Sequence, residues 1–193
     1  GGLSSVAWTD FFTVIVMLLG GLAVTLYGLD MLGGPDGSIV DGFQTMLQRN
    51  QAADGVWRES VARVAEQIKH TGDYNRMSVF QPAAHPVVPW TSWIFIVFSV
   101  SIWYNVLNQF MIQRVLGAKD KYHARMGVIL AGFMQLFLPL IIVVPGMILF
   151  ASKPDILMLP WEQVKPEADK AYVVMIQTLV PIGLRGLVLA AIF

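Results

Sequence analysis

The sequence predicts an all-α integral membrane protein, and three observations support this fold class. Hydrophobic residues make up 55% of the 193 residues and charged residues only 13%, about half the charged share of an ordinary soluble domain. The mean hydropathy is +0.60. The charged residues are clustered, and the apolar stretches between them are long enough to cross a ~30 Å hydrocarbon core as helices, which takes roughly 20 residues.

Composition also excludes several functions. The formal net charge is zero, so no basic surface predicts nucleic-acid binding, and no glycine-rich phosphate loop or metal-ligand cluster occurs in the sequence. Cysteine is absent, which excludes thiolate chemistry and disulfides. His70, His85 and His123 lie in polar segments, where we expect surface positions. We therefore expect no enzymatic activity, no resident cofactor and no nucleic-acid partner.

Residues 11–32 form the first predicted span. As a helix they would cover about 33 Å. Gly20 and Gly21 predict close helix packing, because small residues let two backbones approach each other within lipid. Gly33, Gly34 and Pro35 follow directly, and we expect them to end the helix.

Residues 33–89 form a polar segment that we expect to lie in water. The segment holds six acidic and five basic residues, too many charges to cross a membrane. Within it, Trp57, Val61 and Val64 recur at helical spacing, which predicts an amphipathic helix over about 56–69. We expect this helix to pack on its own protein, with binding of a partner as the alternative.

The second predicted span, residues 93–112, carries several polar side chains in an otherwise apolar and aromatic stretch. They are Ser101, Tyr104, Asn105, Asn108 and Gln109. Unsatisfied amides in hydrocarbon cost several kcal/mol, so these groups must face protein, water or a bound solute.

The third predicted span covers residues 127–150. Gln135 lies in its first half, and Pro139 and Pro145 lie in its second half, where each removes a backbone hydrogen-bond donor. We expect kinks at both prolines.

A fourth span is predicted over residues 184–193, cut short by the end of the chain. Arg185 then lies just inside the membrane interface, where a long cation can reach water, and a loop helix ends before it near Val180. The chain has no initiator Met and stops in an apolar run, so we expect it to be an internal fragment.

The distribution of loop charge predicts the topology. Residues 113–126 hold four basic residues and one acidic residue, whereas residues 33–89 and 151–171 each carry a net charge of −1. Cytoplasmic loops are enriched in Lys and Arg. We therefore expect the connector 113–126 in the cytoplasm, the two longer loops outside, and the first span running outward.

Several segments, spread from one end of the chain to the other, carry a resemblance to a known family. They are GGLSSVAWTDFFTVIVMLLGG at 1–21, PWTSWIF at 89–95, NQFMIQRVLGAKDKYHARMGVILAGF at 108–133, DKAY at 169–172 and GLRGLVLAA at 183–191. On these segments the chain resembles the sodium/glucose cotransporter family, also called the sodium:solute symporter family.

The resemblance implies a fold and a place for this chain within it. It implies a leucine-transporter-type inverted-repeat fold, with this chain as a fragment of one transporter domain covering about core helices 5 to 8. The helix that supplies paired hydroxyl ligands to sodium would then continue beyond residue 193, so the sodium ligands are expected outside 1–193.

The resemblance also implies roles for individual residues. Asp10 matches a carboxylate on the sodium exit path, with a helix-end acid stabilised by the helix dipole as the alternative. Tyr104 matches an aromatic residue that closes the sugar site, and Ser101 stands three residues earlier on the same helical face, where relatives carry Asn or Thr. Asn105 is a further candidate for solute binding, although interhelical hydrogen bonding is the alternative for Asn105 and its polar neighbours. Gln135 replaces a Lys of similar sugar transporters, which favours another polar solute over glucose.

The leading hypothesis is sodium-coupled secondary transport of a small polar organic solute, a sugar or sugar-like compound, by alternating access. The protein would then be a multi-pass protein of the cell (inner) membrane, with sodium ions, the solute and the lipid bilayer as partners. One alternative is a transporter-like membrane sensor that signals without transport. A membrane-embedded enzyme or structural subunit is a third hypothesis, but it would need clustered His or acidic residues inside the spans, which the sequence lacks.

Overall fold

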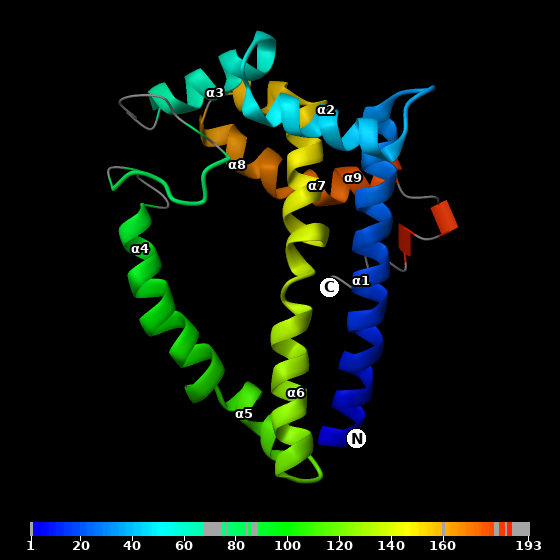
Figure 1. Cartoon of the computed structure of the whole chain (residues 1–193), viewed down its shortest axis with the longest axis vertical. Helices are drawn as coiled ribbons and strands as arrows, with labels where there is room; N and C mark the ends of the chain where they lie inside the picture. The colour runs from blue at the N-terminus through cyan, green and yellow to red at the C-terminus, as the bar shows by residue number, and fades with distance from the viewer. Residues whose placement is uncertain are drawn as a thin grey trace. The chain divides into compact units, whose positions relative to one another are not determined.

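The structure is a computed structural model that describes residues 2–67, 75, 77–83, 85, 89–159, 161–179, 182–183 and 185–186. In these ranges the regular elements are helices (Figure 1). An isolated β-bridge joins Gln81 to Pro89. The chain divides into two compact units. Unit 1 comprises residues 1–12 and 80–137, and unit 2 comprises residues 13–79 and 138–193.

The first helix, α1, spans Leu3–Gly33 and contains the first predicted span. Its 31 residues are long and apolar enough to cross a membrane, and it begins eight residues before the predicted start. Gly20 and Gly21 are buried, in agreement with the predicted close packing. Gly34 follows with a φ of 82°, a left-handed conformation that ends helices and suits glycine, so the predicted end of the helix is confirmed.

The core of unit 2 lies where α1, α2 (Ile39–Gln51), α7 (Leu138–Ser152) and α9 (Ala171–Leu179) pack together. Its fully buried side chains include Val24, Met46, Ile148 and Ile176. Thr25, only 5% exposed, donates its hydroxyl hydrogen to the carbonyl of Leu140 at 2.7 Å and lies 3.0 Å from the carbonyl of Gly21. The hydroxyl therefore joins α1 to α7 by a buried hydrogen bond.

Helix α2 begins with a capping box. The Ser38 hydroxyl accepts from the Asp41 amide at 3.3 Å, and the Asp41 carboxylate accepts from the Ser38 amide at 2.7 Å. The backbone hydrogen bond from Ser38 is the larger cause that lowers the pKa of Asp41 below its ordinary value of 3.8. Helix α2 ends at Ala52, whose φ of 52° is left-handed. This helix was not predicted from the sequence.

Helix α2 crosses the C-terminal end of α7 (Figure 1). Two side chains of α2 hold the two helices together there. Arg49 donates to the carbonyl of Ala151 at 3.0 Å, and Asn50, 1% exposed, donates to the carbonyl of Met147 at 2.9 Å. Helix C-termini leave carbonyls without intrahelical partners, and Arg49 satisfies one of them.

The predicted amphipathic helix is present as α3, Gly55–Gln67, while residues 68 and 69 lie outside the described part of the chain. It packs on the 3₁₀-helix η3, Pro154–Met158. Ser60 is fully buried there, with its hydroxyl 3.2 Å from the carbonyl of Pro154, and Val61 is 8% exposed. The apolar side of α3 therefore rests on its own protein.

In unit 1 the second predicted span is helical but not one regular helix. The short helix α4, Trp90–Phe95, continues into the π-helical segments η1, Ile96–Ser101, and η2, Trp103–Leu107. Asn108 then adopts an extended conformation with φ −70° and ψ 115°, and α5 follows over Gln109–Leu116. The Asn108 side chain accepts from the Phe110 amide at 3.0 Å and so caps the start of α5.

The third predicted span falls on α6, Lys121–Met134, and α7, which are separated by a turn at residues 135–137. The stretch Lys121–Ser152 is the second one apolar enough to cross a membrane. A turn interrupts the predicted span one turn before Pro139, which is the second residue of α7, as the loss of a backbone donor at proline favours. Pro145 lies inside α7, which continues on both sides of it.

Helix α6 begins at Asp120, whose carboxylate accepts from the amide of His123 at 2.9 Å. This hydrogen bond is the largest cause that lowers the pKa of Asp120. His123 is exposed as expected, but the surface prediction was wrong for His85, which is 7% exposed. His70 lies outside the described residues.

The last described elements are α8, Trp161–Asp169, and α9, which ends at Leu179. The loop helix expected to end near Val180 corresponds to α9, although Val180 itself lies outside the described residues. Of the predicted fourth span, 184–193, the structure describes only Arg185 and Gly186. That prediction therefore falls almost entirely outside the described chain.

Candidate functional site

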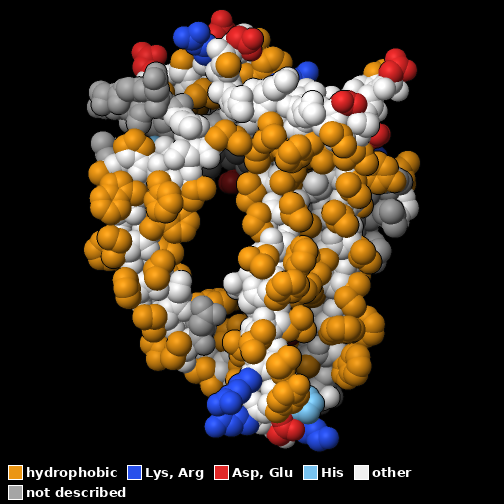
Figure 2. Space-filling view, viewed as in Figure 1, with side chains coloured by type: hydrophobic (Ala, Val, Ile, Leu, Met, Phe, Trp, Pro, Cys, Tyr) orange, Lys and Arg blue, Asp and Glu red, His pale blue; other side chains and the backbone are white. Residues whose placement is uncertain are grey.

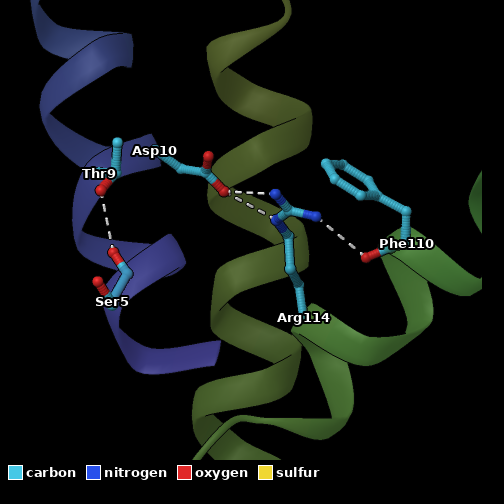
Figure 3. Close-up of polar contacts among 5 residues, drawn as sticks. All are labelled: Ser5, Thr9, Asp10, Phe110 and Arg114. Carbon is cyan, nitrogen blue, oxygen red and sulfur yellow. Dashed lines mark hydrogen bonds and ion pairs between the residues drawn. The ribbon is translucent and has the colours of Figure 1, made fainter. Parts of the chain in front are cut away.

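An ion pair in unit 1 joins Asp10 of α1 to Arg114 of α5 (Figure 3). Arg114 donates to Oδ2 of Asp10 twice, from Nη2 at 2.5 Å and from Nε at 2.9 Å. The Arg114 side chain is 26% exposed and the Asp10 side chain 45%, so water reaches both partners. The acidic residue implied to lie on a sodium path thus has a cationic partner 104 residues away in the sequence.

Arg114 is held in place by its own helix as well. Its Nη1 donates to the carbonyl of Phe110 at 3.2 Å, and its Cζ lies 3.3 Å from the centroid of the Phe110 ring. A guanidinium this close to a ring face gains a favourable cation–π interaction. The positive charge opposite Asp10 is therefore positioned by contacts that do not involve Asp10.

An open hollow of about 720 Å³ lies beside Arg114. Helices α1 and α5 and the residue after α5 line it, through Leu3, Val6, Phe110, Gln113, Arg114, Leu116 and Gly117. Gly117 packs so closely on Leu3 that a Cβ atom at this position would overlap the Leu3 side chain.

The predicted solute-binding residues lie on two segments of unit 1. Ser101 ends η1, and Tyr104 lies in η2 and is 47% exposed. Asn105 also lies in η2, but its side chain is outside the described part of the structure. Gln135 caps the C-terminal end of α6 and is exposed. That these residues share one solute site stays a prediction.

Two features of this region escaped the sequence analysis. Arg114 was counted only as a charge that sets topology, although its position four residues after Phe110 on a helix permits the observed cation–π contact. The π-helical geometry of residues 96–107 has no signal in hydropathy or spacing, because such segments depend on backbone packing.

The charges of unit 1 gather at its α5–α6 connector. Figure 2 shows Lys and Arg side chains there, beside an acidic one, next to hydrophobic side chains that cover α6. The exposed cations are Lys119, Lys121 and Arg125. On α6, Ile129, Leu130 and Phe133 are 56 to 64% exposed, and apolar surface of this extent needs lipid or other helices to cover it. The described residues contain no group of three or more His, Asp or Glu side chains that would suit a metal ion.

Comparison with known proteins places these features in a family. The model of the sodium:solute symporter family matches residues 1–193. The chain is 30% identical to the sodium/myo-inositol cotransporter of Mus musculus and 31% identical to the sodium/glucose cotransporter of Vibrio parahaemolyticus. The matches cover 98% and 100% of this chain.

The match extends over only part of each relative. It covers 27% of the Mus musculus protein and 33% of the Vibrio parahaemolyticus protein. The sodium/glucose cotransporter 4 of Danio rerio is 28% identical over 98% of this chain and 28% of its own length. No solved structure matches the chain. Because the family match covers every residue from 1 to 193, this chain belongs to the sodium:solute symporter family.

Proposed function

We propose that the protein containing this chain couples the movement of sodium ions to the uptake of a small, neutral, hydroxyl-rich solute by alternating access. The observation that carries the proposal is the family match over residues 1–193 together with relatives whose names specify sodium and either myo-inositol or glucose. A membrane potential supplies about 2.3 kcal/mol per charge per 100 mV, enough for ~50-fold accumulation with one sodium ion.

The proposed solute site uses Ser101, Tyr104, Asn105 and Gln135. These groups are uncharged donors and acceptors, which match the hydroxyls of a polyol or sugar. A tyrosine ring can cover the face of a sugar or polyol while its hydroxyl makes one hydrogen bond. Gln135 supplies an amide where a Lys would supply a cation, and we propose that this difference favours a polyol over glucose.

The proposed arrangement in the membrane follows the loop charges. We propose an inverted-repeat fold of the leucine-transporter type in a multi-pass protein of the cell membrane, with α1 running outward and the basic connector 113–126 in the cytoplasm. The exposed apolar side chains of α6 and the polar helices α2 and α3 support this assignment. The proposed topology places Asp10 at the cytoplasmic end of α1, where its carboxylate would contact sodium leaving the protein.

The test is uptake by the full-length protein reconstituted into liposomes. We expect labelled myo-inositol or glucose to enter faster under an inward sodium gradient than under an equal potassium gradient, and an inside-negative potential to increase the rate. Binding of either solute without sodium-dependent uptake would contradict transport and support a sensor.

A further inference from the structure

We propose that the hollow between α1 and α5 is a binding site for one anionic phospholipid. An acyl chain would lie in the hollow, and the headgroup phosphate would lie on the basic connector that follows α5. This inference goes beyond the proposed function, since it concerns the membrane and not the transported solute. It uses the proposed arrangement in the membrane, in which this end of unit 1 lies at the cytoplasmic leaflet.

The hollow is mostly apolar and carries no net charge inside. Its apolar lining consists of Leu3, Val6, Phe110 and Leu116. Its volume of about 720 Å³ lies within the range of about 300 to 1,000 Å³ that small-molecule sites occupy. Arg114 also lines it, but its guanidinium is paired with Asp10 (Figure 3). Because these two charges neutralise each other, the hollow suits a hydrocarbon chain more than a free anion.

The connector that follows the hollow carries the charge that a phosphate needs. Its exposed cations are Lys119, Lys121 and Arg125. Within the described residues none of these three cations has an ion-pair partner. The acid of the connector, Asp120, lies instead 2.9 Å from Nδ1 of His123. The connector therefore presents a net positive surface next to hydrophobic side chains (Figure 2), and an anionic headgroup is complementary to it.

Aromatic side chains mark the depth of the headgroups at the same end of unit 1. Trp8 is exposed and lies two residues before Asp10 on α1, about 3 Å along the helix. Its ring stacks on that of Phe12 at a centroid distance of 6.1 Å and meets the ring of Phe11 edge-on at 6.0 Å. Tryptophan is enriched where hydrocarbon meets the headgroups. The hollow therefore lies at the depth where a phospholipid changes from headgroup to acyl chain.

The charge of the connector favours this occupant over two others. The match spans only 27 to 33% of two relatives, so further helices of the same protein are one alternative. Such helices would explain the apolar lining but not the three cations beside it. A zwitterionic lipid carries its own cation next to its phosphate and gains little from the connector. An anionic phospholipid supplies a hydrocarbon chain and a net negative charge in one molecule.

The first experiment locates the lipid on the full-length protein in detergent micelles. The protein receives phosphatidylglycerol or phosphatidylcholine with the same photoactivatable acyl chain, and labelled residues are identified by mass spectrometry of peptides after illumination. We expect phosphatidylglycerol to label Val6 and Phe110 about tenfold more than phosphatidylcholine does. Val128, an exposed apolar residue of α6 that does not line the hollow, is the internal control and should be labelled equally by both lipids.

The second experiment tests the basic connector by measuring the Kd for phosphatidylglycerol with native mass spectrometry. Lys119→Gln/Lys121→Gln should raise the Kd about 25-fold, which is about fivefold for each lysine. Lys119→Arg/Lys121→Arg keeps both charges and should bind like the wild type. The matched control is Arg58→Gln/Arg63→Gln, which removes two exposed cations from α3 of unit 2 and should leave the Kd unchanged.

The third experiment tests the hollow by filling it. Val6→Phe adds a ring to the lining and should abolish the selective labelling of Phe110 by phosphatidylglycerol. Val128→Phe makes the same change on the exposed side of α6 and should leave that labelling intact.

Four results would overturn the proposal. Equal labelling of the hollow by both lipids would indicate ordinary boundary lipid, and no labelling there would indicate that other helices fill it. Displacement of phosphatidylglycerol by an equal concentration of glycerol phosphate would show that the connector binds phosphate without a chain. An unchanged Kd in Lys119→Gln/Lys121→Gln would exclude the connector. None of these measurements requires transport, so a failure of the proposed function would leave them decisive.

Discussion

Replacing Gly42 with alanine should destabilise the packing of α2 on α1. A Cβ atom at Gly42 would overlap the carbonyl oxygen of Leu29 and lie 3.1 Å from the amide nitrogen of Gly33. Both are backbone atoms of the last turn of α1, which cannot move without breaking that turn. Helix α2 must therefore shift by more than ~1 Å to restore an ordinary contact distance of about 3.5 Å.

The size of the effect follows from what the shift disturbs. The hydrogen bonds from Arg49 to Ala151 and from Asn50 to Met147, at 3.0 and 2.9 Å, hold α2 to α7 and would lengthen together. Overpacking typically costs ~1 to 3 kcal/mol, and a weakened hydrogen bond adds up to ~1 kcal/mol. Alanine regains ~1 kcal/mol of helix propensity, so we expect a net loss of ~1 to 3 kcal/mol.

The assay is thermal inactivation of the full-length protein as a fluorescent fusion in detergent. The fraction that remains monodisperse in size-exclusion chromatography is measured after heating, with all variants heated at one rate because unfolding is irreversible. Gly42→Ala should lower the midpoint below that of the wild type, because the overlap destabilises the folded protein.

Gly127→Ala is the matched control, since a Cβ atom at Gly127 of α6 would meet no atom within 4 Å. Its midpoint should be equal to or above that of the wild type. A midpoint for Gly42→Ala that equals those of the wild type and Gly127→Ala would refute the close approach of α2 and α1.

Three further outcomes are expected. With an impermeant thiol reagent on intact cells, Asp36→Cys should label and Lys119→Cys should not; labelling of Lys119→Cys from outside would reverse the topology. The folded state lowers the pKa of Asp41, so its stabilising effect is complete above the ordinary value of 3.8 and is lost as the pH falls through the lower, folded value. The melting difference between wild type and Asp41→Asn should therefore be present at pH 7 and shrink below about pH 4, and a difference independent of pH would contradict the capping role. Gln135→Lys should shift uptake from myo-inositol towards glucose; an equal loss for both solutes would assign Gln135 to packing.

The sequence predicted those elements whose signals are local. Hydropathy located α1, and Gly34 marked its end correctly, because a left-handed residue suits glycine. The spacing of Trp57, Val61 and Val64 located the start of α3 to within one residue. The family was also predicted correctly, from short motifs distributed along the whole chain.

Helix α2 was missed although a local signal was present. Ser38 and Asp41 stand three residues apart, as a capping box requires, but Gly42, Thr45 and Asn50 lower the helix propensity of the segment. The helix is stabilised by tertiary contacts, namely those of Arg49 and Asn50 with α7, which sequence spacing does not show.

The pairing of Asp10 with Arg114 could not be predicted from periodicity. The two residues are 104 positions apart, and loop charge alone gave Arg114 no individual role. The cap that Asn108 provides at the start of α5 was not predicted either. It depends on where the chain turns between η2 and α5, which the polarity of a single residue does not indicate.

The central claim is that sodium drives the solute, and the most direct test is accumulation under controlled gradients. Liposomes that contain the full-length protein are given an inward sodium gradient, and labelled myo-inositol or glucose is added outside. The internal solute concentration is measured before and after a sodium ionophore is added. We expect accumulation above the external concentration and its collapse when the sodium gradient is dissipated. Accumulation that persists without the gradient, or a solute that only equilibrates, would contradict sodium-coupled transport.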